Sequence, residues 1–209
     1  NRTPEGITFP LALKPGESAV ILLNQGVAPA GAPKPPANTR QWDALTAEVT
    51  AGDENSLVLD YARLSMDGTT YGETLPIAAV SDQLLRAEEN RTVYLQYAFT
   101  VQELPRTLFL ETEYTAADAI WVNGQAVSLS LPGTLHRACG RCDILPFTKV
   151  GENVVVVKLA YYQKPQVYDV LFHTPDVTES LINCLVYDTT VEALYLRGDF
   201  GVFVPDGFR

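Results

Sequence analysis

From Val93 to Val101, large apolar side chains alternate with polar or smaller ones at all but one position, Tyr94. Successive side chains of a β-strand point to opposite faces, so this alternation predicts a strand with one face in a core. A second segment, residues 154–162, repeats the pattern with Lys158 on the outward side. The side chains that we expect to face inward are Val93, Leu95, Tyr97, Phe99, Val101, Val155, Val157, Leu159 and Tyr161.

The rest of the pattern indicates a mainly β fold. Further strands are expected at residues 57–64, 108–113, 119–122 and 191–196, with turn signals between them. Helical spacing of apolar residues is confined to 77–85 and, more weakly, to 178–185, where Thr178 would be the N-cap. Strands and helices do not alternate regularly, which argues against a parallel α/β fold. The sequence therefore predicts a β-sandwich or jelly roll with one or two short helices.

The first 41 residues differ in character from the rest. Apolar stretches on either side of Lys14-Pro15-Gly16-Glu17 predict a hairpin, and four prolines within residues 25–38 predict an extended connector. A lone hairpin is marginally stable in water. We assign residues 1–41 to the tail of a preceding domain with its linker, and residues 42–209 to the sandwich. The start is neither a Met nor a signal peptide, so we expect a longer parent polypeptide.

Charge narrows the classes of partner. The chain has 15 Lys and Arg against 25 Asp and Glu, a net charge of −10. This excess repels phosphate backbones and anionic lipid, and no apolar run is long enough to span a bilayer. We therefore expect neither a nucleic acid nor a membrane as partner. A neutral ligand such as a sugar is compatible with the charge.

Three stretches in a fixed order carry a resemblance to a known family. Residues 55–63 precede Asp67-Gly68, residues 119–127 contain Asn123-Gly124, and Cys142-Asp143-Ile144 precedes residues 150–157, which contain Gly151-Glu152-Asn153. In this order they resemble the galactose-binding-like jelly roll, the sugar-binding domain of glycoside hydrolase family 2 and of related rhamnosidase-type glycosidases. The resemblance covers roughly residues 42–203. An alternative reading is that these motifs are fold-determining turns without a ligand role.

The resemblance implies a non-catalytic accessory domain that packs against the catalytic domain of the same polypeptide. Glycoside hydrolysis needs two facing carboxylates at a controlled separation, and the sequence marks no such pair. We assign no catalytic residue. The resemblance implies no cofactor apart from a structural calcium ion, for which Asp60, Asp67 and Asp143 are the candidate ligands.

The candidate carbohydrate-binding residues are Trp121, Tyr162 and Trp42. A pyranose presents an apolar C–H surface on which an aromatic ring can stack. If Ile120 and Val122 face the core, Trp121 points to solvent or to a neighbouring domain. A free-standing carbohydrate-binding module with exposed aromatic residues is the main alternative function.

A metal site is a further alternative. His136, Cys139 and Cys142 lie close together in the sequence, and Cys184 or His173 could supply a fourth zinc ligand. The segment has no second Cys-x-x-Cys and no strand–helix context typical of a redox site. The other interpretation is a loop with partly buried thiols. A zinc-stabilised interaction domain is therefore the third function considered.

Overall fold

The computed structural model describes residues 2–3, 6–7, 10–14, 18–21 and 52–203, and the chain divides into two compact units, 1–50 and 51–209. In the first unit β1 (Arg2–Thr3) pairs with β2 (Gly6–Ile7) in antiparallel register. Residues 10–14 and 18–21 have no strand, so the hairpin predicted around Lys14-Pro15-Gly16-Glu17 is not seen in its described part. The proline-rich connector and the proposed boundary after residue 41 lie outside the described residues.

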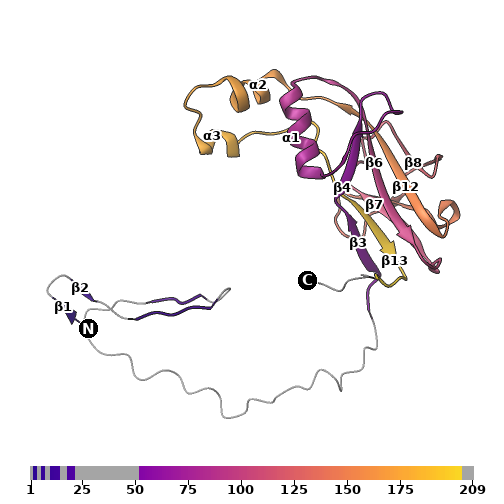
Figure 1. Ribbon diagram of the computed structural model, residues 1–209, viewed down its shortest axis with the longest axis horizontal. Helices are drawn as coiled ribbons and strands as arrows, with labels where there is room; N and C mark the ends of the chain where they lie inside the picture. The colour runs from indigo at the N-terminus through magenta and orange to yellow at the C-terminus, as the bar shows by residue number, and fades with distance from the viewer. Residues whose placement is uncertain (1, 4–5, 8–9, 15–17, 22–51, 204–209) are drawn as a thin grey trace, which may run out of the picture. The chain divides into compact units, whose positions relative to one another are not determined.

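The second unit is a β-sandwich of two antiparallel sheets, as Figure 1 shows. From edge to edge the six-stranded sheet consists of β5 (Thr74–Pro76), β4 (Tyr61–Ser65), β6 (Arg91–Val101), β12 (Gly151–Tyr161), β8 (Ala119–Val122) and β9 (Gln125–Val127). The five-stranded sheet consists of β10 (Leu131–Pro132), β11 (Gly140–Asp143), β7 (Leu108–Thr112), β13 (Leu194–Gly198) and β3 (Asn55–Leu59). The predicted mainly β sandwich is confirmed.

The two long strands form the centre of the sandwich. β6 pairs with β12 along its whole length, from Val101 opposite Gly151 to Arg91 opposite Tyr161. The alternating side chains predicted to face inward are buried on these strands, except that Val101 at the end of β6 is only partly buried. Leu108 and Leu110 on β7 and Leu194 and Leu196 on β13 fill the core from the opposite sheet. Alternation alone therefore located both faces of the central strands.

The helical segments lie at the margin of the sandwich. Helix α1 (Ile77–Ala87) packs against β4 and β5 and buries Val80 and Leu84 in the same core. The short helices α2 (Pro165–Tyr168) and α3 (Glu179–Asn183), joined by a π-helical turn at Asp169–His173, project from the sheets (Figure 1). Thr178 caps α3, as predicted, by accepting a hydrogen bond from the Leu181 N–H. No helix in the described ranges is long and apolar enough to cross a membrane.

One strand prediction is wrong. The sequence predicted a single strand over residues 57–64, but the chain forms β3 and β4, which belong to different sheets. Asp60 separates them, and its carbonyl accepts a hydrogen bond from the Ile77 N–H at the start of α1. Apolar residues on both sides of Asp60 made the two short strands look continuous.

Candidate functional site

The outward face of the six-stranded sheet holds one of the two tryptophans. Trp121 lies between the buried Ile120 and Val122 on β8, so its side chain points away from the core. In register, Trp121 is opposite Val156 on β12 and Ala126 on β9. The side chain is partly exposed. The structure thus places Trp121 where the alternation predicted it.

The row that contains Trp121 continues across the sheet. Val156 is opposite Gln96 on β6, and Gln96 is opposite Arg63 on β4. Beside this row, Lys158 on β12 lies 3.8 Å from the Asp118 carboxylate, measured from its Nζ to Oδ2. We call the surface made by Trp121, Val156, Gln96, Arg63 and Lys158 the tryptophan face. It combines an indole ring with amide, guanidinium and ammonium groups, which are the groups that stack on and hydrogen-bond to sugars.

The β4–β5 loop holds Arg63 in place at one side of the tryptophan face. Arg63 Nε donates to the Gly72 carbonyl at 2.9 Å, and Nη2 donates to the Tyr71 carbonyl at 3.3 Å. Arg63 Nη1 donates to Gln96 Oε1 at 3.3 Å. The loop itself rests on the sheet at Gly68, where a Cβ would meet the Tyr94 ring at 3.0 Å and the backbone has a positive φ. The sequence indicated the outward direction of Trp121 and Lys158. It did not indicate the other side chains of this face or the register that aligns them.

Tyr162, the second carbohydrate candidate, does not join this face. Tyr162 is 47% exposed and follows the last residue of β12. It is six positions from Val156, which corresponds to roughly 20 Å along a strand. Trp121 and Tyr162 therefore do not flank a single sugar ring. Trp42 lies outside the described residues.

The outward face of the five-stranded sheet carries a cluster of charged residues. Glu111 is fully buried, and its carboxylate accepts hydrogen bonds from Thr134 Oγ1 at 2.9 Å and from the Leu135 N–H at 2.6 Å. Arg141 donates to both carboxylate oxygens of Glu54, at 2.6 and 2.8 Å, and its guanidinium lies 3.8 Å from the centre of the Phe109 ring. The hydrogen bond from Arg141 holds the pKa of Glu54 below its ordinary value.

Both Glu54 and Glu111 lie on this surface, and each is held by structural partners. Thr134 connects Glu111 to Arg141, the partner of Glu54, because its hydroxyl donates to Glu111 and accepts from Arg141 Nη1 at 3.1 Å. Glu54, whose pKa is lowered by Arg141, stays ionised and does not donate a proton to a leaving group. The arrangement is suited to fixing the loop at 133–135 over the sheet.

The three metal candidates separate in the structure. Cys142 packs in the core between the sheets, whereas Cys139 lies beside Gly133 and Glu111 on the outward side. His136 is exposed, and its Nδ1 accepts a hydrogen bond from the Ala138 N–H at 3.2 Å. The described residues contain no group of three or more His, Cys, Asp or Glu side chains arranged to hold a metal ion. Cys139 directly precedes β11 and Cys142 lies within it, and the two thiols are on opposite sides of the sheet.

The aspartates considered for calcium also occupy separate positions. Asp67 Oδ1 accepts from the N–H groups of Thr69 and Thr70, each at 2.7 Å, and from Ser65 Oγ at 3.0 Å. The Thr70 and Thr69 N–H groups keep the pKa of Asp67 far below its ordinary value. Asp143 Oδ1 accepts from the Leu145 N–H, and Asp60 lies between β3 and β4. Asp67 and Asp143 act as caps of local turns.

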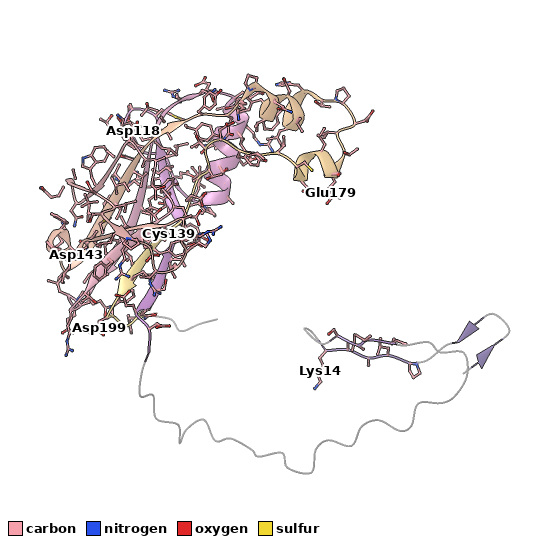
Figure 2. All side chains as sticks on the ribbon, turned by 180° about the vertical axis from the view of Figure 1, so that it is seen from behind. Lys14, Asp118, Cys139, Asp143, Glu179 and Asp199 are labelled. Carbon is pink, nitrogen blue, oxygen red and sulfur yellow. The ribbon has the colours of Figure 1, made fainter. Side chains whose placement is uncertain are left out.

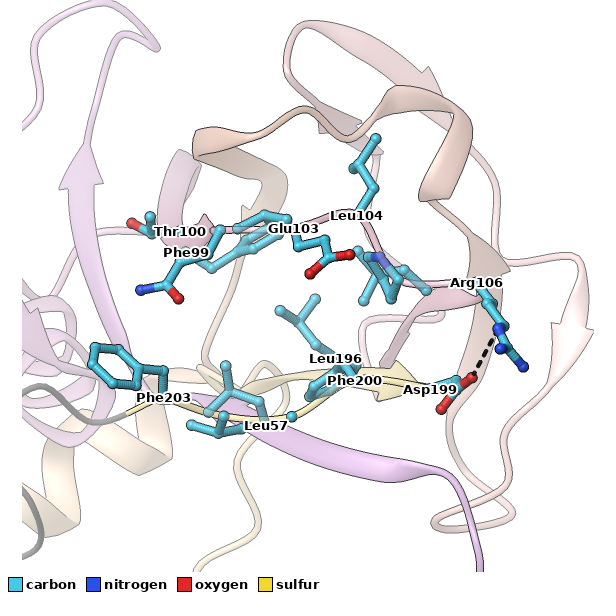
Figure 3. A pocket seen from close by; sticks show the side chains of 16 residues that line it. Leu57, Phe99, Thr100, Glu103, Leu104, Arg106, Leu196, Asp199, Phe200 and Phe203 are labelled. Carbon is cyan, nitrogen blue, oxygen red and sulfur yellow. Dashed lines mark ion pairs between the residues drawn. The ribbon is translucent and has the colours of Figure 1, made fainter.

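Sequence reasoning did not anticipate a groove at one end of the sandwich, shown in Figure 3. It has a volume of about 880 Å³ and lies between the β6–β7 loop and the residues that follow β13. Phe99, Leu57 and Leu196 line it from the core, and Phe203, which is 66% exposed, lines it from the surface. Arg106 and Asp199 form an ion pair of 4.0 Å at its rim. Figure 2 shows Asp199 and Asp118 at opposite ends of the sandwich.

Comparisons with known proteins do not assign the chain to a family. No protein-family model matches the sequence, and no curated protein matches it significantly. Among solved structures, a β-glucuronidase from an uncultured Clostridium species is similar, with a TM-score of 0.40 and 14% sequence identity. The similarity covers 73% of this chain and 30% of that protein, so the matched region is less than a third of the β-glucuronidase.

Proposed function

We propose that the β-sandwich is a non-catalytic accessory domain of a larger glycoside hydrolase, and that its tryptophan face binds carbohydrate. The observation that carries the proposal is the register that aligns Trp121, Val156, Gln96 and Arg63 across four strands. This row offers a sugar an apolar ring to stack on and fixed polar groups to hydrogen-bond with. Because it is built on paired strands, the face is preorganised and loses little conformational entropy on binding.

The proposed non-catalytic role is supported by the way the charged cluster is used. Glu54 and Glu111 are held by Arg141, Thr134 and the Leu135 N–H, so both stabilise the fold. The order of the motifs at Asn123-Gly124 and Gly151-Glu152-Asn153 supports assignment to a glycoside hydrolase. On this proposal the partner is the catalytic domain of the same polypeptide.

The test is a calorimetric screen of the chain against plant and mucin oligosaccharides, including galactosides and rhamnosides, followed by two variants. Trp121→Ala removes the stacking ring from the tryptophan face. Phe203→Ala is the matched control, because it removes an exposed aromatic ring from the groove. We expect Trp121→Ala to weaken binding at least about tenfold and Phe203→Ala to leave it unchanged, with both variants folded.

Two results would contradict the proposal in different ways. Absence of binding across the panel would rule out the carbohydrate-binding role, and binding that survives Trp121→Ala would rule out the tryptophan face as its site. Sequencing of the natural polypeptide tests the accessory role separately. If the natural polypeptide has no catalytic domain, the chain is a free-standing carbohydrate-binding module that uses the same face.

A further inference from the structure

We infer that the tryptophan face recognises an acidic oligosaccharide, and that Arg63 binds the carboxylate of one of its sugar residues. The inference rests on the proposed function, because it names the class of carbohydrate that the same face would bind. It comes from the hydrogen-bonding state of Arg63 and from the position of this residue relative to Trp121.

Arg63 is held only by neutral acceptors. Its three nitrogens donate to the carbonyl oxygens of Gly72 and Tyr71 and to the side-chain oxygen of Gln96. No carboxylate within residues 52–203 lies at ion-pair distance from this guanidinium, although the chain carries ten more acidic than basic residues. The positive charge of Arg63 is therefore available to a ligand.

The guanidinium also retains donors for such a ligand. Each terminal nitrogen carries two N–H groups, and the structure uses one on Nη1 and one on Nη2. The side chain is exposed, and its Cζ lies 5.8 Å from the centre of the Tyr71 ring. A guanidinium fixed in this way keeps one N–H group on each terminal nitrogen for a carboxylate, with little entropy left to lose.

The distance between Arg63 and Trp121 fits an oligosaccharide better than a monosaccharide. The two residues are in one row, three strand spacings apart, which corresponds to about 14 Å. A sugar residue stacked on Trp121 would therefore leave a later residue of the same chain at Arg63. Lys158 lies next to this path, but its ammonium group is shared with Asp118 at 3.8 Å.

Two acidic features oppose the binding of an anion, namely the net charge of the chain and the nearby Asp67. The net charge of −10 repels anions at long range, but at physiological ionic strength this repulsion is screened beyond about 8 Å. Asp67 belongs to the β4–β5 loop, and its Oδ1 is turned toward the N–H groups of Thr69 and Thr70. A direct charged hydrogen bond at Arg63 outweighs the screened field, because such bonds are roughly twice as strong as neutral ones.

The experiment compares matched acidic and neutral ligands by calorimetry. The probes are trimers of galacturonic, glucuronic and mannuronic acid, each beside its methyl ester, which keeps the backbone and removes the charge. We expect at least one acid to bind at least about tenfold more tightly than its ester. Arg63→Gln should abolish this difference, so that the acid binds no more tightly than its ester, while Trp121→Ala should weaken binding of both ligands.

Two further variants separate charge from geometry and from unfolding. Arg63→Lys keeps the charge without the fork and should retain only part of the preference for the acid. Arg106→Gln removes an exposed arginine at the groove and should retain the full preference. Binding of the ester to Arg63→Gln, together with an unchanged thermal transition, shows that this variant is folded.

The outcomes distinguish this inference from the proposed function. Equal binding of acids and esters, or a preference that persists in Arg63→Gln, would overturn the inference and leave carbohydrate binding intact. Failure of every acidic and neutral oligosaccharide to bind would overturn both.

Discussion

Asn123 and Asn153 are thirty positions apart in the chain, and their side-chain amides are joined by a hydrogen bond of 2.8 Å from Nδ2 of the first to Oδ1 of the second. Asn123 has a φ of +49° and is followed by Gly124 at +82°, which fits the tight turn between β8 and β9. Asn153 is fully buried and also bonds to the backbone of Lys149 and Gly151. The side chains of both asparagines therefore connect the two turns in which they lie.

Replacement of Asn153 by Ala should destabilise the sandwich. The change leaves the Asn123 amide and the Lys149 backbone groups without their buried partner, which costs about 2–3 kcal/mol in the free energy of unfolding. Urea denaturation measures this cost. Asn183→Ala on the exposed surface of α3 is the matched control and should change stability by less than about 0.5 kcal/mol. Equal effects of the two changes would mean that the buried amide is not structurally important.

The Glu54–Arg141 pair should give the fold a measurable dependence on pH. Glu54 has a lowered pKa when folded, so the unfolded chain binds more protons as the pH falls below the ordinary glutamate value of 4.5. The pair stabilises the fold above that value, and its contribution is lost as the pH falls toward the lowered pKa of the folded state.

Glu54→Gln is the variant that isolates this contribution. At pH 7 it should be less stable than the natural sequence by roughly 1–2 kcal/mol, since Arg141 is buried but Glu54 is partly exposed. The difference should shrink as the pH is lowered through 4.5, as followed by denaturation at a series of pH values. A difference independent of pH would show that the ion pair is not its origin.

The three cysteines should differ in reactivity. Cys139 and Cys142 are buried, and burial raises the pKa of the Cys142 thiol to about 11, whereas Cys184 is exposed. A thiol-reactive reagent at neutral pH should therefore modify Cys184 rapidly and the other two only after unfolding. Mass spectrometry of the labelled peptides identifies the site. Rapid labelling of Cys142 would contradict the core packing described for β11.

Gly198 should tolerate no side chain. It ends β13, and a Cβ there would overlap the carbonyl group of Thr107. Gly198→Ala should lower the free energy of unfolding by more than about 2 kcal/mol, because the clash is with backbone that cannot easily move. The control Gly201→Ala places a methyl group in open space and should leave the unfolding midpoint nearly unchanged.

The sequence predicted best those strands in which one face is apolar and the other is polar. Val93–Val101 and the segment around Val155 met this condition, because water on one side imposes an alternation that can be read directly. Strand β11 was not predicted. On its outward side, Glu54 and Phe109 cover Arg141, and on its inward side Cys142 is buried in the core. A strand buried on both sides by mixed residue types has no periodic signal.

The candidate site was predictable only in part. The direction of Trp121 followed from its neighbours Ile120 and Val122, because alternation is a local property. Its alignment with Arg63 depends on the register of four strands that are distant in the chain. Register is set by the packing of the whole sheet, so no local pattern indicated that these two residues share a row.

The most direct test of a carbohydrate-binding tryptophan face is an NMR titration that follows the indole N–H signals of the two tryptophans. Trp121→Phe assigns the signals, and the titrant is the tightest-binding oligosaccharide of the calorimetric screen. We expect the Trp121 signal to shift progressively and to saturate, together with backbone signals of Gln96 and Arg63. A ligand that binds the chain while the Trp121 signal remains unmoved would contradict this expectation.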